Sequence, residues 1–111
     1  MKSDRTYLDH IEECIRRVEK NTAGGHTLFL ADDTLQDAVL RNLQTLSEAT
    51  QRLSSGLKAA HPEVEWDRIA AFRNVLVHNY LGIDLETVWR VVREEIPVLK
   101  GQVRTMLAET Q

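Results

Sequence analysis

The sequence predicts an all-α protein built as an up-and-down four-helix bundle. Apolar residues recur at three- and four-residue steps along most of the chain, which is the spacing of one face of a helix. The 111 residues include only five glycines and two prolines, and apolar and polar residues do not alternate as they would in strands. Four such segments joined by short connections favour a bundle in which neighbouring helices run antiparallel.

The first two helices are expected on either side of a polar connection. Ser3 or Asp4 is a suitable N-cap for the first helix, which ends at Gly24–Gly25. The connection HTLFLADD follows, and Asp32 or Asp33 caps the second helix. The apolar stripes of these helices are formed by Tyr7, Leu8, Ile11, Cys14, Ile15 and Val18, and by Leu35, Ala38, Val39, Leu46, Ala49 and Leu53.

The third and fourth helices are expected in the second half of the chain. The third begins near Glu65 and runs through the segment RNVLVHNY toward Gly82. Asp84 is placed to cap the fourth helix, whose apolar stripe continues past Pro97. Because proline has no backbone N–H to donate, we expect this last helix to be kinked or broken near Pro97. His61 falls in the connection before the third helix and is expected to be solvated.

Length, composition and charge limit the classes of protein. With 42% apolar and 28% charged residues, the chain suits one globular domain spanning residues 1–111. No stretch approaches the roughly 18 consecutive apolar residues of a membrane span, and we expect no secretory leader. Cys14 is the single cysteine, which fits a reducing, cytoplasmic setting. The net charge of −3 argues against a protein that coats nucleic acid, and no DNA partner is expected.

The segment RNVLVHNY, residues 73–80, places five polar side chains around three aliphatic ones. On an ideal helix Arg73 and Tyr80 are about 700° apart and so face nearly the same way, whereas Arg73 and His78 differ by about 140°. Arg73 and His78 would therefore meet only if the helix loosens near His78 or if a second copy of the chain contributes. A two-fold dimer that pairs these segments would bring two arginines and two histidines to one cleft.

Such a cleft could cleave RNA without a metal ion. The Arg73 guanidinium can bind two phosphate oxygens and stabilise the charge that builds up in a transition state. His78 can take a proton from a ribose 2′-hydroxyl or give one to the leaving oxygen. Asn74 can orient a phosphate oxygen or His78. In the alternative interpretation Arg73 and Tyr80 are solvated, and a charged His78 complements the negative carboxyl end of the helix.

A metal site is a further alternative. His10, Glu13 and Cys14 are spaced so that they share one face of the first helix. Cys14 also belongs to the apolar stripe, however, and Glu13 suits solvent. The sequence shows no Glu-x-x-His pair or second ligand cluster that would complete the site. We therefore expect neither a metal nor another cofactor.

The whole pattern resembles the HepT-like family of minimal HEPN-domain ribonuclease toxins over nearly the full chain. Its motif, which is Arg, a polar residue, three further residues, His, any residue and Tyr, is matched by residues 73–80. The surrounding positions that match are Ser47–Glu48–Ala49, Pro62, Trp66, Ile83–Asp84, Val88–Trp89 and Pro97. Glu65 and Ala71 depart from the pattern, because a second proline and a glycine are common there, but both lie outside the reactive residues.

This resemblance implies an all-helical homodimer that cleaves RNA without metal. Arg73 and His78 of both subunits would be catalytic at the dimer cleft, with Asn74 supporting them. Independently of the resemblance, Glu48 would orient the guanidinium if it faces Arg73, and would otherwise be an exposed residue of its helix. The resemblance also implies a partner, an MntA-like minimal nucleotidyltransferase antitoxin, that silences the toxin by transferring AMP to Tyr80. The alternative is a non-catalytic HEPN-type module that binds the nucleotidyltransferase and cuts no RNA, which the acidic composition slightly favours.

Overall fold

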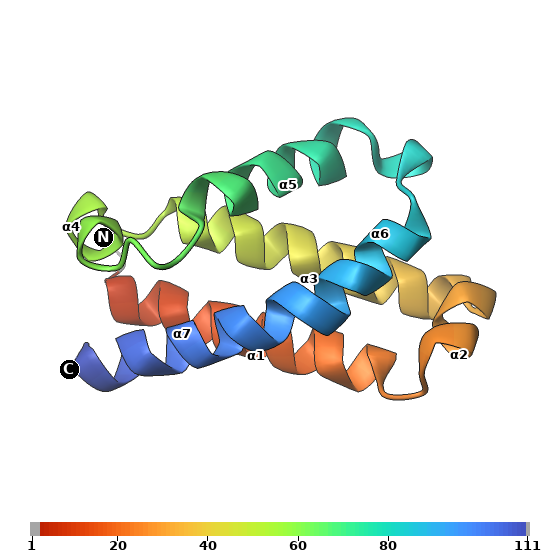
Figure 1. Ribbon diagram of the computed structural model, residues 1–111, viewed down its shortest axis with the longest axis horizontal. Coiled ribbons are helices and arrows are strands. Elements are labelled where there is room, and N and C mark those ends of the chain that lie inside the picture. The colour runs from red at the N-terminus through yellow and green to blue at the C-terminus, as the bar shows by residue number, and fades with distance from the viewer. Residues whose placement is uncertain (1–2, 111) are drawn as a thin grey trace.

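The computed structural model describes residues 3–110 and consists of helices joined by short connections (Figure 1). The elements in order are α1 (Asp4–Thr22), α2 (His26–Ala31), α3 (Asp33–Gln51), α4 (Ser55–Ala60), α5 (Trp66–His78), the 3-10 turn η1 (Tyr80–Gly82), α6 (Leu85–Arg90), the π-helical segment η2 (Val91–Glu95) and α7 (Ile96–Glu109). Because α1, α3, α5 and the α6–η2–α7 stretch run alternately up and down, the predicted all-α bundle is confirmed. Within these residues no helix is both long and apolar enough to cross a membrane.

The antiparallel pair α1 and α3 forms the centre of the bundle. Its buried residues are Leu8, Ile11, Cys14, Ile15 and Val18 of α1 and Val39, Leu40, Leu43, Leu46 and Ala49 of α3. The Ser3 hydroxyl accepts a hydrogen bond from the backbone N–H of Thr6. The Asp32 carboxylate accepts from the N–H groups of Thr34 and Leu35. These predicted caps satisfy N–H groups that the first helical turn leaves unpaired.

Helix α5 packs chiefly along α3 and stands apart from α1 and α7 (Figure 1). Leu76 is the one fully buried residue of α5, with 1% of its surface exposed. Trp66, Ile69 and Phe72 are partly buried against the same core. The helix that carries most of the RNVLVHNY segment therefore rests on a narrow apolar contact.

Pro97 changes the hydrogen bonding of the last helical stretch. Because proline has no N–H, the carbonyl of Arg93 cannot accept the usual bond from the residue four positions later. Residues Val91–Glu95 widen into a π-helix, and the N–H of Ile96 donates to the carbonyl of Val91. The predicted disturbance near Pro97 is thus a π-helical segment, and the stretch continues through it without a break.

Two short helices occupy segments that were expected to be irregular. Helix α2 forms within HTLFLADD and buries Phe29, whose ring centroid lies 5.4 Å from that of Trp89. Helix α4 forms between α3 and α5, and Ser54 caps it by accepting a hydrogen bond from the N–H of Leu57. The apolar contact of Phe29 draws the first of these segments onto the bundle.

His61 is buried, so the expectation that it is solvated was wrong. Its Nδ1 lies 2.8 Å from Glu63 Oε2, and its Nε2 lies 2.9 Å from Glu109 Oε1. The hydrogen bond to Glu63 and the negative charges of both carboxylates raise the pKa of His61 above its usual 6.5, although burial opposes this change. This clamp joins the α4–α5 connection to the end of α7.

Candidate active site

Helix α5 remains a regular α-helix through His78, and η1 begins at Tyr80. The helix does not loosen before His78, so the angular offset of about 140° between Arg73 and His78 persists. One of the two expected ways for these side chains to meet was a helix that loosens near His78, and α5 shows no such loosening. Within one chain the helix therefore does not bring Arg73 and His78 to the same face.

Arg73 is held by side chains of α3 and α5. Its Nη2 donates to Glu48 Oε2 at 3.4 Å, and its Nη1 donates to Asn74 Oδ1 at 3.3 Å. Its Nε is buried and has no hydrogen-bond partner among residues 3–110. A buried donor without a partner costs free energy, and an anion at this position would satisfy it. Glu48 thus contacts the Arg73 guanidinium, as its predicted orienting role requires. The guanidinium also keeps N–H donors that an anion could accept.

The Arg73 side chain lines a polar hollow of about 850 Å³ between α1, α3 and α5. The other polar residues that line this hollow include Tyr7, His10, Thr45, Glu48 and Arg52. Sequence reasoning had not placed His10 or Arg52 beside Arg73, because their proximity depends on how three helices pack. The hollow falls within the size range of small-ligand sites.

Tyr80 faces the same side of α3 as Arg73. Its hydroxyl donates to Asp37 Oδ1 at 3.1 Å, while much of its ring is exposed. Asp37 and Glu48 are eleven residues apart on α3, which is a rotation of about 20° beyond three full turns. Arg73 and Tyr80 therefore contact one face of α3, although Tyr80 lies in η1, beyond the regular helix to which their seven-residue spacing applies. Burial raises the pKa of Tyr80 above its usual 10, and the hydrogen bond to Asp37 and the charge of Asp37 raise it further.

His78 is exposed on α5. It lines neither the hollow beside Arg73 nor the groove between α5 and α7 that is described below. Three large apolar residues close to it in sequence are exposed: Val75 by 47%, Val77 by 38% and Leu81 by 99%. Asn74 is also exposed. One protomer thus brings together Arg73, Asn74 and Glu48, and leaves His78 exposed on another face of α5.

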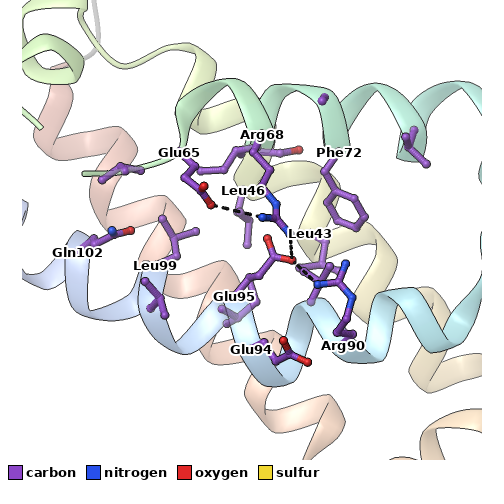
Figure 2. Close-up of a pocket in the computed structure, with 18 of the residues that line it drawn as sticks. Leu43, Leu46, Glu65, Arg68, Phe72, Arg90, Glu94, Glu95, Leu99 and Gln102 are labelled. Carbon is purple, nitrogen blue, oxygen red and sulfur yellow. Dashed lines mark hydrogen bonds and ion pairs between the residues drawn. The ribbon is translucent and has the colours of Figure 1, made fainter. Parts of the chain in front are cut away.

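A second hollow of about 630 Å³ separates α5 from the α6–η2–α7 stretch, with α3 as its floor (Figure 2). Its apolar lining includes Leu43, Leu46, Ile69, Phe72 and Leu99. Arg68 of α5 crosses this groove and donates to Glu95 Oε2 at 2.9 Å, and Arg90 donates to the same oxygen at 2.9 Å. Periodicity alone did not reveal this groove, because it arises from the divergence of α5 and α7.

The three residues of the alternative metal site do not converge on one point. Hydrogen bonds from Arg16 and Arg17 to the Glu13 carboxylate lower the pKa of Glu13 to about 2. Cys14 is buried, and burial raises the pKa of its thiol. His10 Nε2 lies 3.9 Å from Cys14 Sγ. Over residues 3–110 no group of three or more His, Cys, Asp or Glu side chains gathers as metal ligands would.

Comparison with known proteins assigns the family. The model of the family described as ribonuclease HepT-like matches residues 11–106. The chain is 37% identical over 102 residues to the protein named probable ribonuclease HepT of Thermococcus cleftensis, covering 91% of this chain and 93% of that protein. It is 34% identical over 108 residues to a candidate RNase of Caldanaerobacter subterraneus, covering 96% of each. No solved structure matches. The chain belongs to the ribonuclease HepT-like family.

Proposed function

We propose that this chain is a metal-independent endoribonuclease toxin that cleaves RNA in a cleft between two copies of itself. The observation that carries the proposal is Arg73, whose guanidinium is oriented by Glu48 and Asn74 while its buried Nε has no partner among the described residues. Arginine with free donors suits a phosphoryl group, because its planar N–H groups match phosphate oxygens. The names of the related proteins point to the same substrate class.

The dimer is proposed because one protomer holds Arg73 and His78 on different faces of α5. Exposed apolar side chains lie near His78 in the sequence, at Val75, Val77 and Leu81, and exposed apolar patches mark surfaces that contact other proteins. A two-fold axis beside this face would set His78 of one copy against the Arg73 side of the other. The cleft would then contain both reactive groups, and each would remain on a rigid helix.

In the proposed reaction a ribose 2′-oxygen attacks the adjacent phosphorus, and the bond from phosphorus to the 5′-oxygen of the next nucleotide breaks. His78 takes the proton of the 2′-hydroxyl or, as imidazolium, gives a proton to the departing 5′-oxygen. Arg73 binds the non-bridging oxygens and stabilises their growing negative charge. The products are a 2′,3′-cyclic phosphate and a 5′-hydroxyl. Asn74 orients the phosphoryl group, and Glu48 holds the guanidinium.

The proposed control of this activity is the transfer of AMP to Tyr80 by an MntA-like nucleotidyltransferase antitoxin. The Tyr80 oxygen would form a bond to the α-phosphorus of ATP, pyrophosphate would leave, and the phenolic proton would be lost. The Tyr80 side chain is partly exposed and shares a face of α3 with Arg73, which supports this assignment. An added anionic group would repel the RNA phosphates that Arg73 attracts.

Mixed dimers test the shared site. We expect Arg73→Ala and His78→Ala homodimers to lose at least about 10²-fold of the RNA cleavage rate, in the presence of a chelator. Co-refolded mixtures of the two variants should regain cleavage, because one composite site then holds Arg73 from one copy and His78 from the other. Wild-type protein that cleaves no faster than His78→Ala would refute the ribonuclease proposal and leave the non-catalytic module. A mixture of the two variants that stays inactive would refute the composite site. Wild-type protein that loses its activity in the chelator would refute a metal-free site.

A further inference from the structure

A polar stripe runs along the exposed side of α3 between α1 and α5. We define the α3 stripe as Asp37, Arg41, Thr45 and Glu48 of α3 together with its C-cap residue Arg52, which follow one another at three- and four-residue steps. On a regular helix these five positions fall within about 80° of rotation, so they share one face. All five side chains are exposed or partly exposed. Arg41 and Arg52 are about 16 Å apart along the helix axis.

Both acids of the α3 stripe have a partner, one from η1 and one from α5. Tyr80 donates to Asp37, and Arg73 pairs with Glu48. Arg41 and Arg52 have no carboxylate within ion-pair distance over residues 3–110, whereas Arg16, Arg68 and other arginines pair with glutamates. The α3 stripe therefore presents two arginines whose donors remain available, one on either side of Glu48.

Each end of the α3 stripe also has a tyrosine. Tyr7 lines the 850 Å³ hollow together with Arg52 and Arg73. Tyr80, whose ring is partly exposed, contacts the stripe one turn from Arg41. Basic groups that follow a backbone, combined with aromatic rings on which bases stack, are the features that bind single-stranded nucleic acid without sequence readout.

We propose that the α3 stripe is the binding track for the single-stranded RNA substrate on each protomer. Arg52 and Arg41 bind phosphates on the two sides of the linkage that Arg73 holds, and the hollow beside His10 receives one nucleotide. This inference rests on the proposed ribonuclease function, because it names the surface that guides the same substrate. On this track Tyr80 lies beside the bound RNA strand. A group added to Tyr80 would therefore block RNA binding along the α3 stripe as well as in the cleft.

The track is tested by the salt dependence of RNA binding. The measurement uses the full chain in a His78→Ala background, so that a labelled single-stranded RNA of mixed sequence is bound and not cut. Arg41→Gln and Arg52→Gln should each reduce the slope of log K against log salt by about 0.7, and the double variant by about 1.4, since each contact with a single strand releases that share of counterions. Arg93→Gln on η2 is the matched control, because Arg93 is exposed, has no ion-pair partner in the described chain and lines neither hollow.

Three outcomes separate this inference from the proposed function. Stripe variants that bind RNA as the Arg93→Gln control does would overturn the track, even if wild-type protein cleaves RNA. A reduced salt slope in the stripe variants, together with wild-type protein that cleaves RNA no faster than His78→Ala, would support the track and refute the ribonuclease proposal. Stripe variants that keep full RNA affinity but lose a co-purified protein partner would reassign the α3 stripe to that partner and overturn the inference. Circular dichroism of each variant checks that these surface substitutions leave the fold intact.

Discussion

Replacing Leu76 with alanine tests whether a narrow apolar contact holds α5 to the bundle. Leu76 is the one fully buried residue of α5. Removing a buried leucine side chain costs about 2–5 kcal/mol, from the lost burial and from the cavity that remains. Because α5 packs chiefly on α3 and a groove separates it from α7, the site can partly collapse, so we expect about 2–3 kcal/mol. That cost corresponds to a fall in Tm of roughly 8–24 °C in a domain of this size.

The remaining polar contacts of α5 cannot make up this loss. The Arg68–Glu95 ion pair crosses the groove at 2.9 Å, but both side chains are substantially exposed (Figure 2). Ion pairs of this kind contribute about 0–1 kcal/mol, and the pair is already present in the wild-type protein. The destabilisation should therefore concentrate in α5 and η1, ahead of unfolding of the α1–α3 pair.

Urea unfolding followed by circular dichroism gives the change in the free energy of unfolding, and amide hydrogen exchange shows where the chain opens. Val77→Ala is the control, since Val77 neighbours Leu76 in the same helix but is 38% exposed. Leu76→Ala should speed exchange most in residues 66–82. Equal destabilisation by the two substitutions, or faster exchange spread evenly over the chain, would refute the argument.

Two further predictions concern titrating groups. His61→Gln should lower the free energy of unfolding most between about pH 4.5 and 6.5, measured by denaturation at a series of pH values. Because the pKa of His61 is raised on folding, its stabilisation of the folded state is present below pH 6.5 and is lost as the pH rises through the pKa of His61 in the folded protein. Because the pKa of Glu63 is lowered, its stabilisation is lost as the pH falls through the pKa of Glu63 in the folded protein. A difference in unfolding free energy between wild type and variant that does not vary with pH would contradict the clamp. Asp37→Asn should bring the pKa of Tyr80 back toward 10 without fully restoring it, because burial still raises it. Absorbance titration of the tyrosinate, in protein whose other tyrosine is phenylalanine, checks this shift, and Asp33→Asn should leave it unchanged.

The long helices were predictable because their signals are local. N-caps act within their own first turns: Asp84 caps α6 as predicted, and Ser3 and Asp32 are the caps among the predicted alternatives Ser3 or Asp4 and Asp32 or Asp33. Pro97 removes one backbone donor wherever the chain lies, so a disturbance of the last helix was foreseeable. Its form as a π-helix was not, because the spacing of one proline does not say how the remaining hydrogen bonds rearrange.

Short segments and buried polar groups escaped prediction for the opposite reason. Helix α2 is only six residues long, and its order comes from the burial of Phe29 beside Trp89, sixty residues away. His61 lies in a connection, yet Glu109 from the end of α7 reaches its ring. Neither contact could be predicted from the residues next to it in the sequence, because each depends on a residue far along the chain.

For the candidate site, the residue spacing alone determined that Arg73 and His78 lie on different faces of α5. That relation depends only on the rotation per residue of a regular helix, and the helix stays regular through His78. Only the tertiary structure decided that Glu48 would meet Arg73 and that Asp37 would meet Tyr80. It also left Arg41 and Arg52 beside them without an ion pair among residues 3–110. Backbone geometry sets the register within one helix, whereas contacts between helices depend on how distant apolar faces pack together.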